Sequence, residues 1–168
     1  LRERNFKTQE YAIRFRPDTL ILMGREPSGR DSSAPAVPER VAGKLGKAMQ
    51  FDGKQDVLMV PDCGFSDDAG TMEAWVWIPS ENQPGRHGTI LRLDGSDPWT
   101  YHIIQRDMDS SRITYTTYDG TNGHGLGSGP LAEGWHHVVG THDAKAGKME
   151  LFIDGVSVGT TSYIKTTC

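Results

Sequence analysis

Four Asp-Gly pairs divide this sequence into short runs of β-favouring residues. The pairs lie at residues 52–53, 94–95, 119–120 and 154–155. Glycine adopts a positive φ without steric cost, so each pair favours a tight hairpin turn between antiparallel strands. No segment combines a helical period of apolar residues with a helix cap and a stop signal. The sequence therefore predicts an all-β sandwich or barrel with little helix.

Ten runs are expected to be strands, because β-favouring residues follow one another there between turn signals. They cover residues 11–15, 19–23, 56–60, 71–78, 89–93, 100–105, 112–118, 135–141, 148–153 and 156–160. Two other segments have the composition of loops. Residues 24–43 are rich in Pro, Ser and charged residues and predict a long exposed connection, while the glycine-rich residues 123–134 predict a mobile loop at the rim.

Length and charge limit the kinds of partner. The 168 residues suit one domain with its own core. The formal net charge is only -4 and charges of both signs are interspersed, so no basic stripe is available for nucleic acid. The longest apolar runs, such as residues 20–23, fall far short of the roughly 20 residues that span a bilayer. We therefore expect neither nucleic-acid binding nor a membrane span.

The ends of the chain and its two cysteines place few limits on the fold or the function. The chain begins with Leu1 and a charged segment, without an initiator Met or a signal-peptide apolar region, and is expected to be a fragment or a processed product. Cys63 and Cys168 allow at most one intrachain disulfide. Whether they pair, and in which redox compartment, is left open.

Five segments stand in an order and spacing that resemble a known family. They read GKAMQFDG at 46–53, VLMVP at 57–61, TMEAWV at 71–76, GWHHVVGT at 134–141 and LFIDG at 151–155. Together they resemble the laminin-G-like, concanavalin-A-like jelly-roll family. The resemblance implies an antiparallel two-sheet jelly-roll sandwich for residues 44–168, preceded by N-terminal strands and an exposed loop in residues 1–43. It also implies a secreted or cell-surface protein that binds glycans or proteins, in some members with calcium.

The end of the chain departs from this family. Members usually continue with an Ile-Gly strand and a last strand of the type Gly-x-Ile-Asp-Glu-Val-Arg-Ile-Tyr. Neither follows Thr160, so the resemblance implies a jelly roll without its last strands. An uncovered strand at 156–160 would leave backbone donors and acceptors unpaired. We therefore expect residues 11–15 or 19–23, or a second protein chain, to pair with this edge.

Aromatic residues near hairpin ends are the candidate ligand contacts. Trp99, Tyr101 and Tyr118 lie beside predicted turns, where a ring at the rim of a sandwich can anchor a ligand. His124 in the glycine-rich loop completes the predicted ligand-binding set. The structural alternative is cross-strand pairing of the aromatic residues, which would stabilise the sheet by about 0.2 to 1 kcal/mol per pair.

A second aromatic group lies on the expected strand 71–78. Its period-two pattern places Glu73, Trp75 and Trp77 on the face opposite the core. Two indoles beside a carboxylate suit a sugar, but large aromatic side chains are usually buried, so packing is the preferred interpretation. We accordingly expect six residues to be largely buried. They are Trp75, Val76, Trp135, Val139, Leu151 and Ile153.

Carboxylates in turns are the candidate metal ligands. Calcium takes six to eight oxygen ligands, and Asp107 and Asp109 are the predicted pair. Residues 107–110 resemble the start of a calcium-binding loop but lack its glycine and terminal glutamate, and a hairpin turn explains them without a metal. Zinc is not expected, because the adjacent His136 and His137 should point to opposite faces of a strand.

The sequence favours binding over catalysis. Sandwich glycosidases often carry two acids at alternate positions of one strand, but Glu73 has no acidic residue at position 71 or 75. A Gly-x-Ser-x-Gly nucleophile motif is also missing. We therefore expect a noncatalytic binding module whose ligand is a glycan or glycoprotein. Two alternatives stay open: a structural or assembly subunit completed by strand addition from a partner chain, and an accessory domain of a polysaccharide-processing enzyme.

Overall fold

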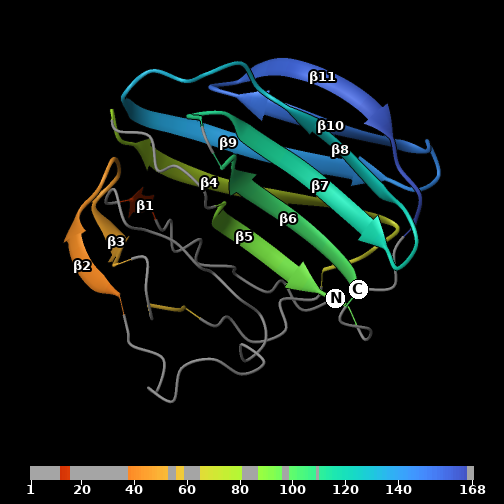
Figure 1. Cartoon of the computed structure of the whole chain (residues 1–168), viewed down its shortest axis with the longest axis horizontal. Helices are drawn as coiled ribbons and strands as arrows, with labels where there is room; N and C mark the ends of the chain where they lie inside the picture. The colour runs from red at the N-terminus through yellow and green to blue at the C-terminus, as the bar shows by residue number, and fades with distance from the viewer. Residues whose placement is uncertain are drawn as a thin grey trace, which may run out of the picture.

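The computed structural model describes residues 12–15, 38–52, 56–58, 65–80, 87–95, 99–108 and 110–165. Within these residues every regular element is a β-strand, and the strands form two packed sheets (Figure 1). The predicted all-β sandwich is therefore confirmed. Because this part of the chain contains no helix, it contains none that is long and apolar enough to cross a membrane.

The larger sheet has seven strands in the order β11-β10-β9-β4-β1-β3-β2. In chain order they are β1 (Ala12–Phe15), β2 (Glu39–Ala42), β3 (Lys47–Phe51), β4 (Ala69–Ile78), β9 (Gly134–Asp143), β10 (Lys148–Ile153) and β11 (Val156–Ser162). Neighbouring strands are antiparallel except at β1, which pairs in parallel with both β3 and β4. One parallel strand thus interrupts the antiparallel sheet that the resemblance implied.

The smaller sheet has four antiparallel strands in the order β5-β6-β7-β8. They are β5 (Gly88–Asp94), β6 (Thr100–Arg106), β7 (Ile113–Asp119) and β8 (Gly123–Gly127). The register of β6 and β7 places Tyr101 opposite Tyr118. Two of the predicted ligand residues therefore lie side by side.

The Asp-Gly pairs form turns of different lengths. At the last pair, Asp154 and Gly155 have φ values of 52° and 79° and connect two residues, Ile153 and Val156, that face each other in the ladder. A positive φ at both central residues is the geometry of a type I′ hairpin, so the predicted two-residue turn is confirmed here. The pair at 119–120 instead opens a longer loop, since β8 begins only at residue 123.

Two segments expected to be loops contain strands. Residues 24–43 end in β2, which pairs with β3, and residues 123–134 begin with β8, which pairs with β7. The loop predictions from composition were wrong here because a short strand is stabilised by its neighbour more than by its own β propensity. In β8 the neighbouring strand leaves no room for a side chain at Gly125, since a Cβ there would lie 2.7 Å from Oγ1 of Thr116. Residues 24–37 lie outside the described part of the chain.

The edge next to β11 is not covered as expected. Residues 11–15 were one predicted cover, but β1, which includes residues 12–15, lies between β4 and β3, with β4, β9 and β10 separating it from β11. That prediction is wrong, because the backbone groups on both sides of β1 are paired within the sheet. The other predicted cover, residues 19–23, lies outside the described residues. The division of the chain at residue 43 stays a prediction.

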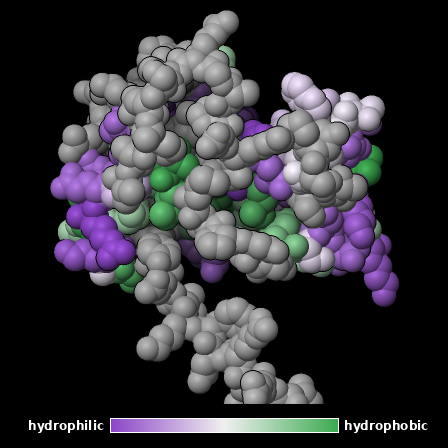
Figure 2. Space-filling model, turned by 90° about the horizontal axis from the view of Figure 1, so that it is seen from below, coloured by the Kyte–Doolittle hydropathy of each residue, from purple (hydrophilic) through white to green (hydrophobic). Residues whose placement is uncertain are grey.

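The hydrophobic core lies between the two sheets. Its buried members are Met49, Phe51, Met72, Ala74, Val76, Ile78, Ile90, Ile104, Ile113, Tyr115, Val138, Met149, Leu151, Ile153 and Tyr163. They alternate along the strands with residues of the outer faces, as a period of two requires. Figure 2 shows hydrophobic residues gathered between hydrophilic flanks when the molecule is seen from below.

Half of the six burial predictions are confirmed. Val76, Leu151 and Ile153 are buried. Trp75, Trp135 and Val139 are only partly buried, so for them the prediction is wrong. The physical reason is the alternation itself, because Trp75 precedes the core residue Val76 on one strand and therefore points to the outer face of the larger sheet.

A polar network crosses the core. The hydroxyl oxygen of Tyr115 on β7 lies 3.1 Å from Nδ1 of His102 on β6 and 3.3 Å from Nδ1 of His142 on β9, so it bridges the two sheets. Nε2 of His102 lies 3.4 Å from a carboxylate oxygen of Asp67 and 3.4 Å from the hydroxyl of Tyr163. All five residues are buried. The network therefore ties the segments before β4 and after β11 to the centre of the sandwich.

Candidate ligand-binding face

Two of the predicted ligand residues lie on the outer face of the smaller sheet. Tyr101 and Tyr118 point away from the core because the residues beside them on the strands, such as His102 and Thr117, are buried between the sheets. The two tyrosine rings stack with their centroids 5.6 Å apart and their planes at 18°. The cross-strand aromatic pairing that was the structural alternative is therefore present.

Arg92 on β5 extends this pair into a row. Its guanidinium carbon lies 4.5 Å from the centroid of the Tyr101 ring. Its Nε and Nη2 each lie 2.7 Å from Oδ1 of Asp94, which makes a two-pronged ion pair. We call Asp94, Arg92, Tyr101 and Tyr118 the outer row. Because β5 and β7 flank β6 on opposite sides, Arg92 and Tyr118 approach Tyr101 from opposite sides. The groups that the row can present to a ligand are therefore charged groups and hydroxyls rather than a free ring face.

The loop after β7 holds one end of the outer row. The hydroxyl of Tyr118 donates to the carbonyl oxygen of Thr121 at 3.3 Å. Oδ1 of Asp119 accepts the backbone N–H groups of Asn122 at 2.6 Å and of Thr121 at 2.8 Å. These hydrogen bonds, with that of Asn122 the largest influence, lower the pKa of Asp119 below its ordinary value. The carboxylate thus stays ionised and keeps the loop closed.

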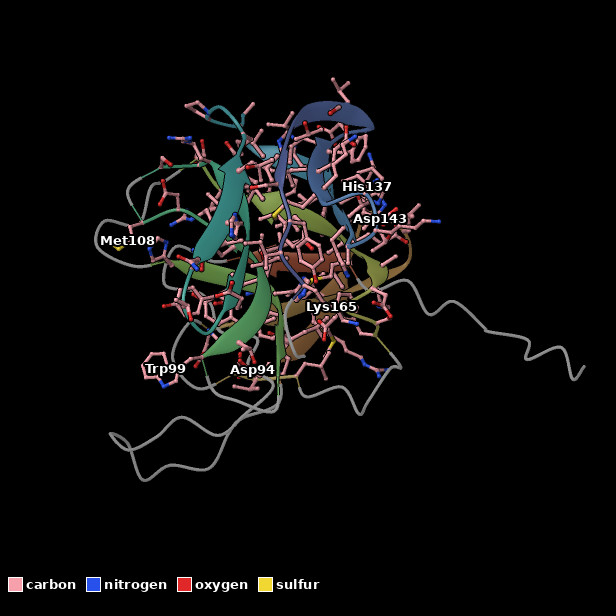
Figure 3. All side chains as sticks on the ribbon, turned by 90° about the vertical axis from the view of Figure 1, so that its right-hand side faces the viewer. Asp94, Trp99, Met108, His137, Asp143 and Lys165 are labelled. Atoms are coloured by element: carbon pink, nitrogen blue, oxygen red, sulfur yellow. The ribbon has the colours of Figure 1, made fainter. Side chains whose placement is uncertain are left out.

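Trp99 supplies an exposed ring near the middle of the row, since β6 is its central strand. It directly precedes β6 and is 68% exposed. The N–H of Gly95 donates to the carbonyl oxygen of Thr100 at 2.8 Å, which closes the loop between β5 and β6 that carries Trp99. Figure 3 shows the indole pointing away from the body of the protein at the same end as Asp94. The structure therefore brings Trp99, Tyr101 and Tyr118 to one region.

His124 does not join these residues. It lies on β8, and its Nδ1 is 3.2 Å from the hydroxyl oxygen of Ser162 on β11. Its Nε2 is buried and has no hydrogen-bond partner among the described residues. This position links β8 to the edge of the larger sheet. The ligand role predicted for His124 stays a prediction that this geometry does not support.

The predicted calcium ligands are placed only in part. Oδ1 of Asp107 accepts the N–H of Met108 at 2.9 Å and lies 3.7 Å from Nδ1 of His87. Asp109 lies outside the described residues. In the described ranges of the chain, no three His, Cys, Asp or Glu side chains come together as metal ligands. The described residues at this turn thus supply one carboxylate toward the six to eight oxygens that calcium takes.

The outer face of the larger sheet carries the second aromatic group. The rings of Trp75 and His137 stack with their centroids 5.1 Å apart and their planes at 26°. The ring of Trp77 meets that of Trp135 edge to face at 5.7 Å. Oε2 of Glu73 lies 3.5 Å from Nε2 of His137. These side chains pair with one another across β4 and β9, which agrees with the packing interpretation of this strand.

His136 and His137 point to opposite faces, as expected. Nδ1 of His136 lies 2.7 Å from a carboxylate oxygen of Asp154, and its Nε2 lies 3.0 Å from the carbonyl oxygen of Ala132. His137 instead stacks on Trp75 on the outer face. The two imidazoles therefore have separate partners and do not converge on one point.

A model of the concanavalin A-like lectin/glucanases superfamily matches residues 52–167. The chain belongs to this superfamily. Among solved structures, a candidate carbohydrate-binding protein from Bacteroides ovatus ATCC 8483 is 16% identical with a TM-score of 0.46, over 64% of this chain and 30% of that one. Domains LG4-5 of the mouse laminin alpha1 chain are 13% identical with a TM-score of 0.41, over 84% of this chain and 36% of theirs.

The concanavalin A-like chain thus spans about a third of the length of each of these two structures. Neither likeness is close enough to transfer a ligand to it. No curated protein matches the chain. The superfamily includes both lectins and glucanases, so membership establishes the fold and leaves the function to be argued from the outer row and Trp99.

Proposed function

We propose that this chain is a noncatalytic glycan-binding module of a secreted or cell-surface protein, and that a sugar ring stacks on Trp99 beside the outer row. The observation that carries the proposal is the exposed indole at the same end of the protein as Asp94, which forms an ion pair with Arg92. An indole combines a large apolar ring with one N–H donor, so an exposed Trp near charged side chains is suited to stack on a ligand ring. The family resemblance supports the extracellular location.

A sugar ring presents two kinds of surface, and this face has a group for each. The C–H groups of the ring form an apolar patch that an indole can cover. The hydroxyl groups need charged or polar partners, and here the carboxylate of Asp94 accepts while the guanidinium of Arg92 donates. Arg92 and Asp94 hold each other at 2.7 Å, so little side-chain entropy is lost when a ligand arrives.

The composition of the same face supports binding rather than hydrolysis. Cleavage of a glycoside requires two carboxyl groups about 5 to 9.5 Å apart on either side of the bond. The outer row contains one carboxylate, Asp94, and that group is engaged by Arg92. A second acid positioned for catalysis is not part of this row, which favours a lectin-like role.

Replacing Trp99 by Ala is expected to weaken glycan binding at least about 10-fold, a loss of about 1.4 kcal/mol, because the variant has no ring on which the sugar can stack. A glycan array of the wild-type chain identifies the ligand, and calorimetry with that ligand measures the affinity of each variant. Met108→Ala is the matched control, because Met108 is another exposed apolar residue in a different loop (Figure 3). Failure of the wild-type chain to bind any glycan, or equal affinity of Trp99→Ala and wild type, would contradict the proposal.

We also propose that a calcium ion binds to Asp107 and Asp109. A ligand that binds only the folded state raises its stability, so saturating calcium is expected to raise the melting midpoint by a few degrees relative to chelator. Differential scanning calorimetry of wild type and Asp107→Asn, each with calcium and with chelator, provides the measurement. The expected result is a shift in wild type that is lost in the variant. An unchanged midpoint in wild type would rule out a specific site there.

A further inference from the structure

Arg106, the last residue of β6, is a buried cation. It is 3% exposed, and the residues at alternate positions before it on the strand, His102 and Ile104, are buried as well. This alternation places Arg106 on the inner face of the smaller sheet, toward the larger one. Water strongly stabilises a charge, so a buried guanidinium normally has a carboxylate or other oxygen acceptors around it.

The guanidinium of Arg106 lacks such partners. Among the described residues it forms no hydrogen bond, ion pair or ring contact. Its cross-strand neighbours offer no acceptor from their side chains, since Gly88 on β5 has none and Ile113 on β7 is apolar. The carboxylate next to it in the sequence, that of Asp107, accepts the N–H of Met108. Burial lowers the pKa of Arg106 below its ordinary value, as expected for a cation that no carboxylate offsets.

Other arginines of the smaller sheet and its turns do have partners. Arg92 forms its ion pair with Asp94, and Nε of Arg112 donates to the carbonyl oxygen of Ser128 at 2.8 Å. Carboxylates are not scarce either, because the chain has 22 acidic residues against 18 Lys and Arg. The combination of burial with a missing partner is thus a property of the position of Arg106.

The nitrogens of Arg106 keep slight contact with solvent. In the described part of the chain, Nε2 of His124 is the only fully buried side-chain nitrogen or oxygen without a hydrogen-bond partner. The nitrogens of Arg106 also have no partner, so they must account for part of the 3% exposure of this residue. Arg106 lies at the end of its strand rather than in the middle of the core. A small solute can therefore approach these N–H groups.

We propose that Arg106 binds a small oxyanion, that is a carboxylate, sulfate or phosphate group, through two N–H groups of its guanidinium. The planar fork of N–H groups matches two oxygens of such a group. Where water is largely excluded, the attraction between a cation and an anion is stronger than at the surface. A water molecule accepts a hydrogen bond but carries no charge to offset that of the guanidinium.

The oxyanion site is separate from the proposed glycan site. Trp99 directly precedes β6 whereas Arg106 ends it, and the 7 residues of this strand span about 20 Å. Figure 3 shows Trp99 and Met108, which lie beyond opposite ends of β6, well apart. Loss of one site is therefore expected to leave the other intact.

Differential scanning calorimetry at constant ionic strength tests the proposal, with sodium sulfate, phosphate or acetate replacing part of the sodium chloride. At least one of these anions is expected to raise the melting midpoint of wild type by a few degrees, with an effect that saturates, because it binds only the folded state. Sulfate and phosphate also stabilise proteins by exclusion from their surface, but that effect does not saturate. Isothermal titration calorimetry with the same anion is expected to show one site per chain.

Three variants assign the effect to the guanidinium. Arg106→Met removes the cation and keeps an unbranched side chain, so the saturable effect is expected to disappear. Arg106→Lys keeps the charge without the fork and is expected to weaken binding at least about 10-fold, which also decides the question if Arg106→Met does not fold. Arg40→Met is the matched control, because Arg40 is an exposed arginine on β2, and its replacement is expected to leave the effect unchanged.

The proposal is overturned if no anion stabilises wild type in a saturable way, or if wild type and Arg106→Met respond equally, which is a general salt effect. Equal affinity of Arg106→Lys and wild type also overturns it. A further variant, Glu81→Gln, tests whether the chain supplies the oxyanion itself, since Glu81 stands between β4 and β5 in the sequence. This variant is expected to bind the anion as wild type does. Binding that Glu81→Gln shows and wild type lacks would assign the guanidinium to that carboxylate instead of a free anion.

Discussion

Acidification from pH 7 to pH 4 is expected to lower the free energy of unfolding by on the order of 3 kcal/mol through one residue, His102. Burial lowers the pKa of this imidazole from 6.5 to about 4, and the nearby His142 adds to the effect, while Asp67 opposes it. The unfolded chain therefore binds a proton at higher pH than the folded chain does. The contribution of His102 to the free energy of unfolding is complete above pH 6.5 and is lost as the pH falls toward 4.

The hydrogen bonds around His102 place its one proton on Nδ1, and burial disfavours a second proton on the ring. Nε2 of His142 lies 2.8 Å from the carbonyl oxygen of Ser66, which can only accept, so this nitrogen carries a hydrogen. The other nitrogen of a neutral His142 then accepts from the hydroxyl of Tyr115. The oxygen of Tyr115 in turn accepts from Nδ1 of His102. A further proton on His102 would gain Asp67 as a partner, but it would place a cation beside a second imidazole in the core.

Chemical denaturation at several pH values measures this effect. His102→Gln removes the titrating group, so its free energy of unfolding is expected to be lower at pH 7 and to fall less steeply between pH 6.5 and pH 4. His87→Gln removes an exposed histidine and serves as the control, with stability at pH 7 expected to stay within about 0.5 kcal/mol of wild type. The carboxylates whose pKa is lowered, such as Asp119, lose their contribution as the pH falls below about 5, but both proteins contain them, so they do not affect the difference between the two slopes. Equal slopes for His102→Gln and wild type would contradict the assignment.

The strands that sequence reasoning found are those with strong local signals on both sides. β4, β9 and β10 combine alternating Val, Ile, Leu and Trp with bounding Gly or Asp residues, and each was predicted to within a few residues. β2 and β8 lack such signals and owe their conformation to β3 and β7. These two strands form because they pair with neighbouring strands. A local sequence pattern carries no information about that pairing.

The candidate site was predictable in part for a similar reason. Trp99, Tyr101 and Tyr118 were predicted because turn residues adjoin them. Arg92 was missed because strict alternation from the buried Ile90 would have directed it into the core. The register of β5 shifts between Thr89 and Leu91, and this irregularity turns Arg92 to the outer face. A shift of one residue reverses every later side chain of a strand, and it depends on the neighbouring strand rather than on the local sequence.

Gly140→Ala is expected to destabilise the domain by about 1 to 3 kcal/mol or more. A Cβ at position 140 would lie 2.8, 2.9 and 3.0 Å from three ring carbons of Tyr115, closer than carbon atoms pack. The ring has little freedom to move, because Tyr115 is fully buried and its hydroxyl is held between His102 and His142. Calorimetry is expected to show a melting midpoint lower by about 2 to 4 °C for each kcal/mol lost.

Two comparisons identify the ring of Tyr115 as the cause of that loss. Gly129→Ala is the matched control, because a Cβ there meets nothing within 4 Å, and its stability is expected to stay within about 0.5 kcal/mol of wild type. In a Tyr115→Leu background the ring is gone, so adding Gly140→Ala is expected to cost less than it does in wild type. Residues in direct contact show such coupling, whereas independent residues have additive effects. Equal costs of Gly140→Ala in both backgrounds would mean that the β9 backbone itself, rather than Tyr115, requires glycine at this position.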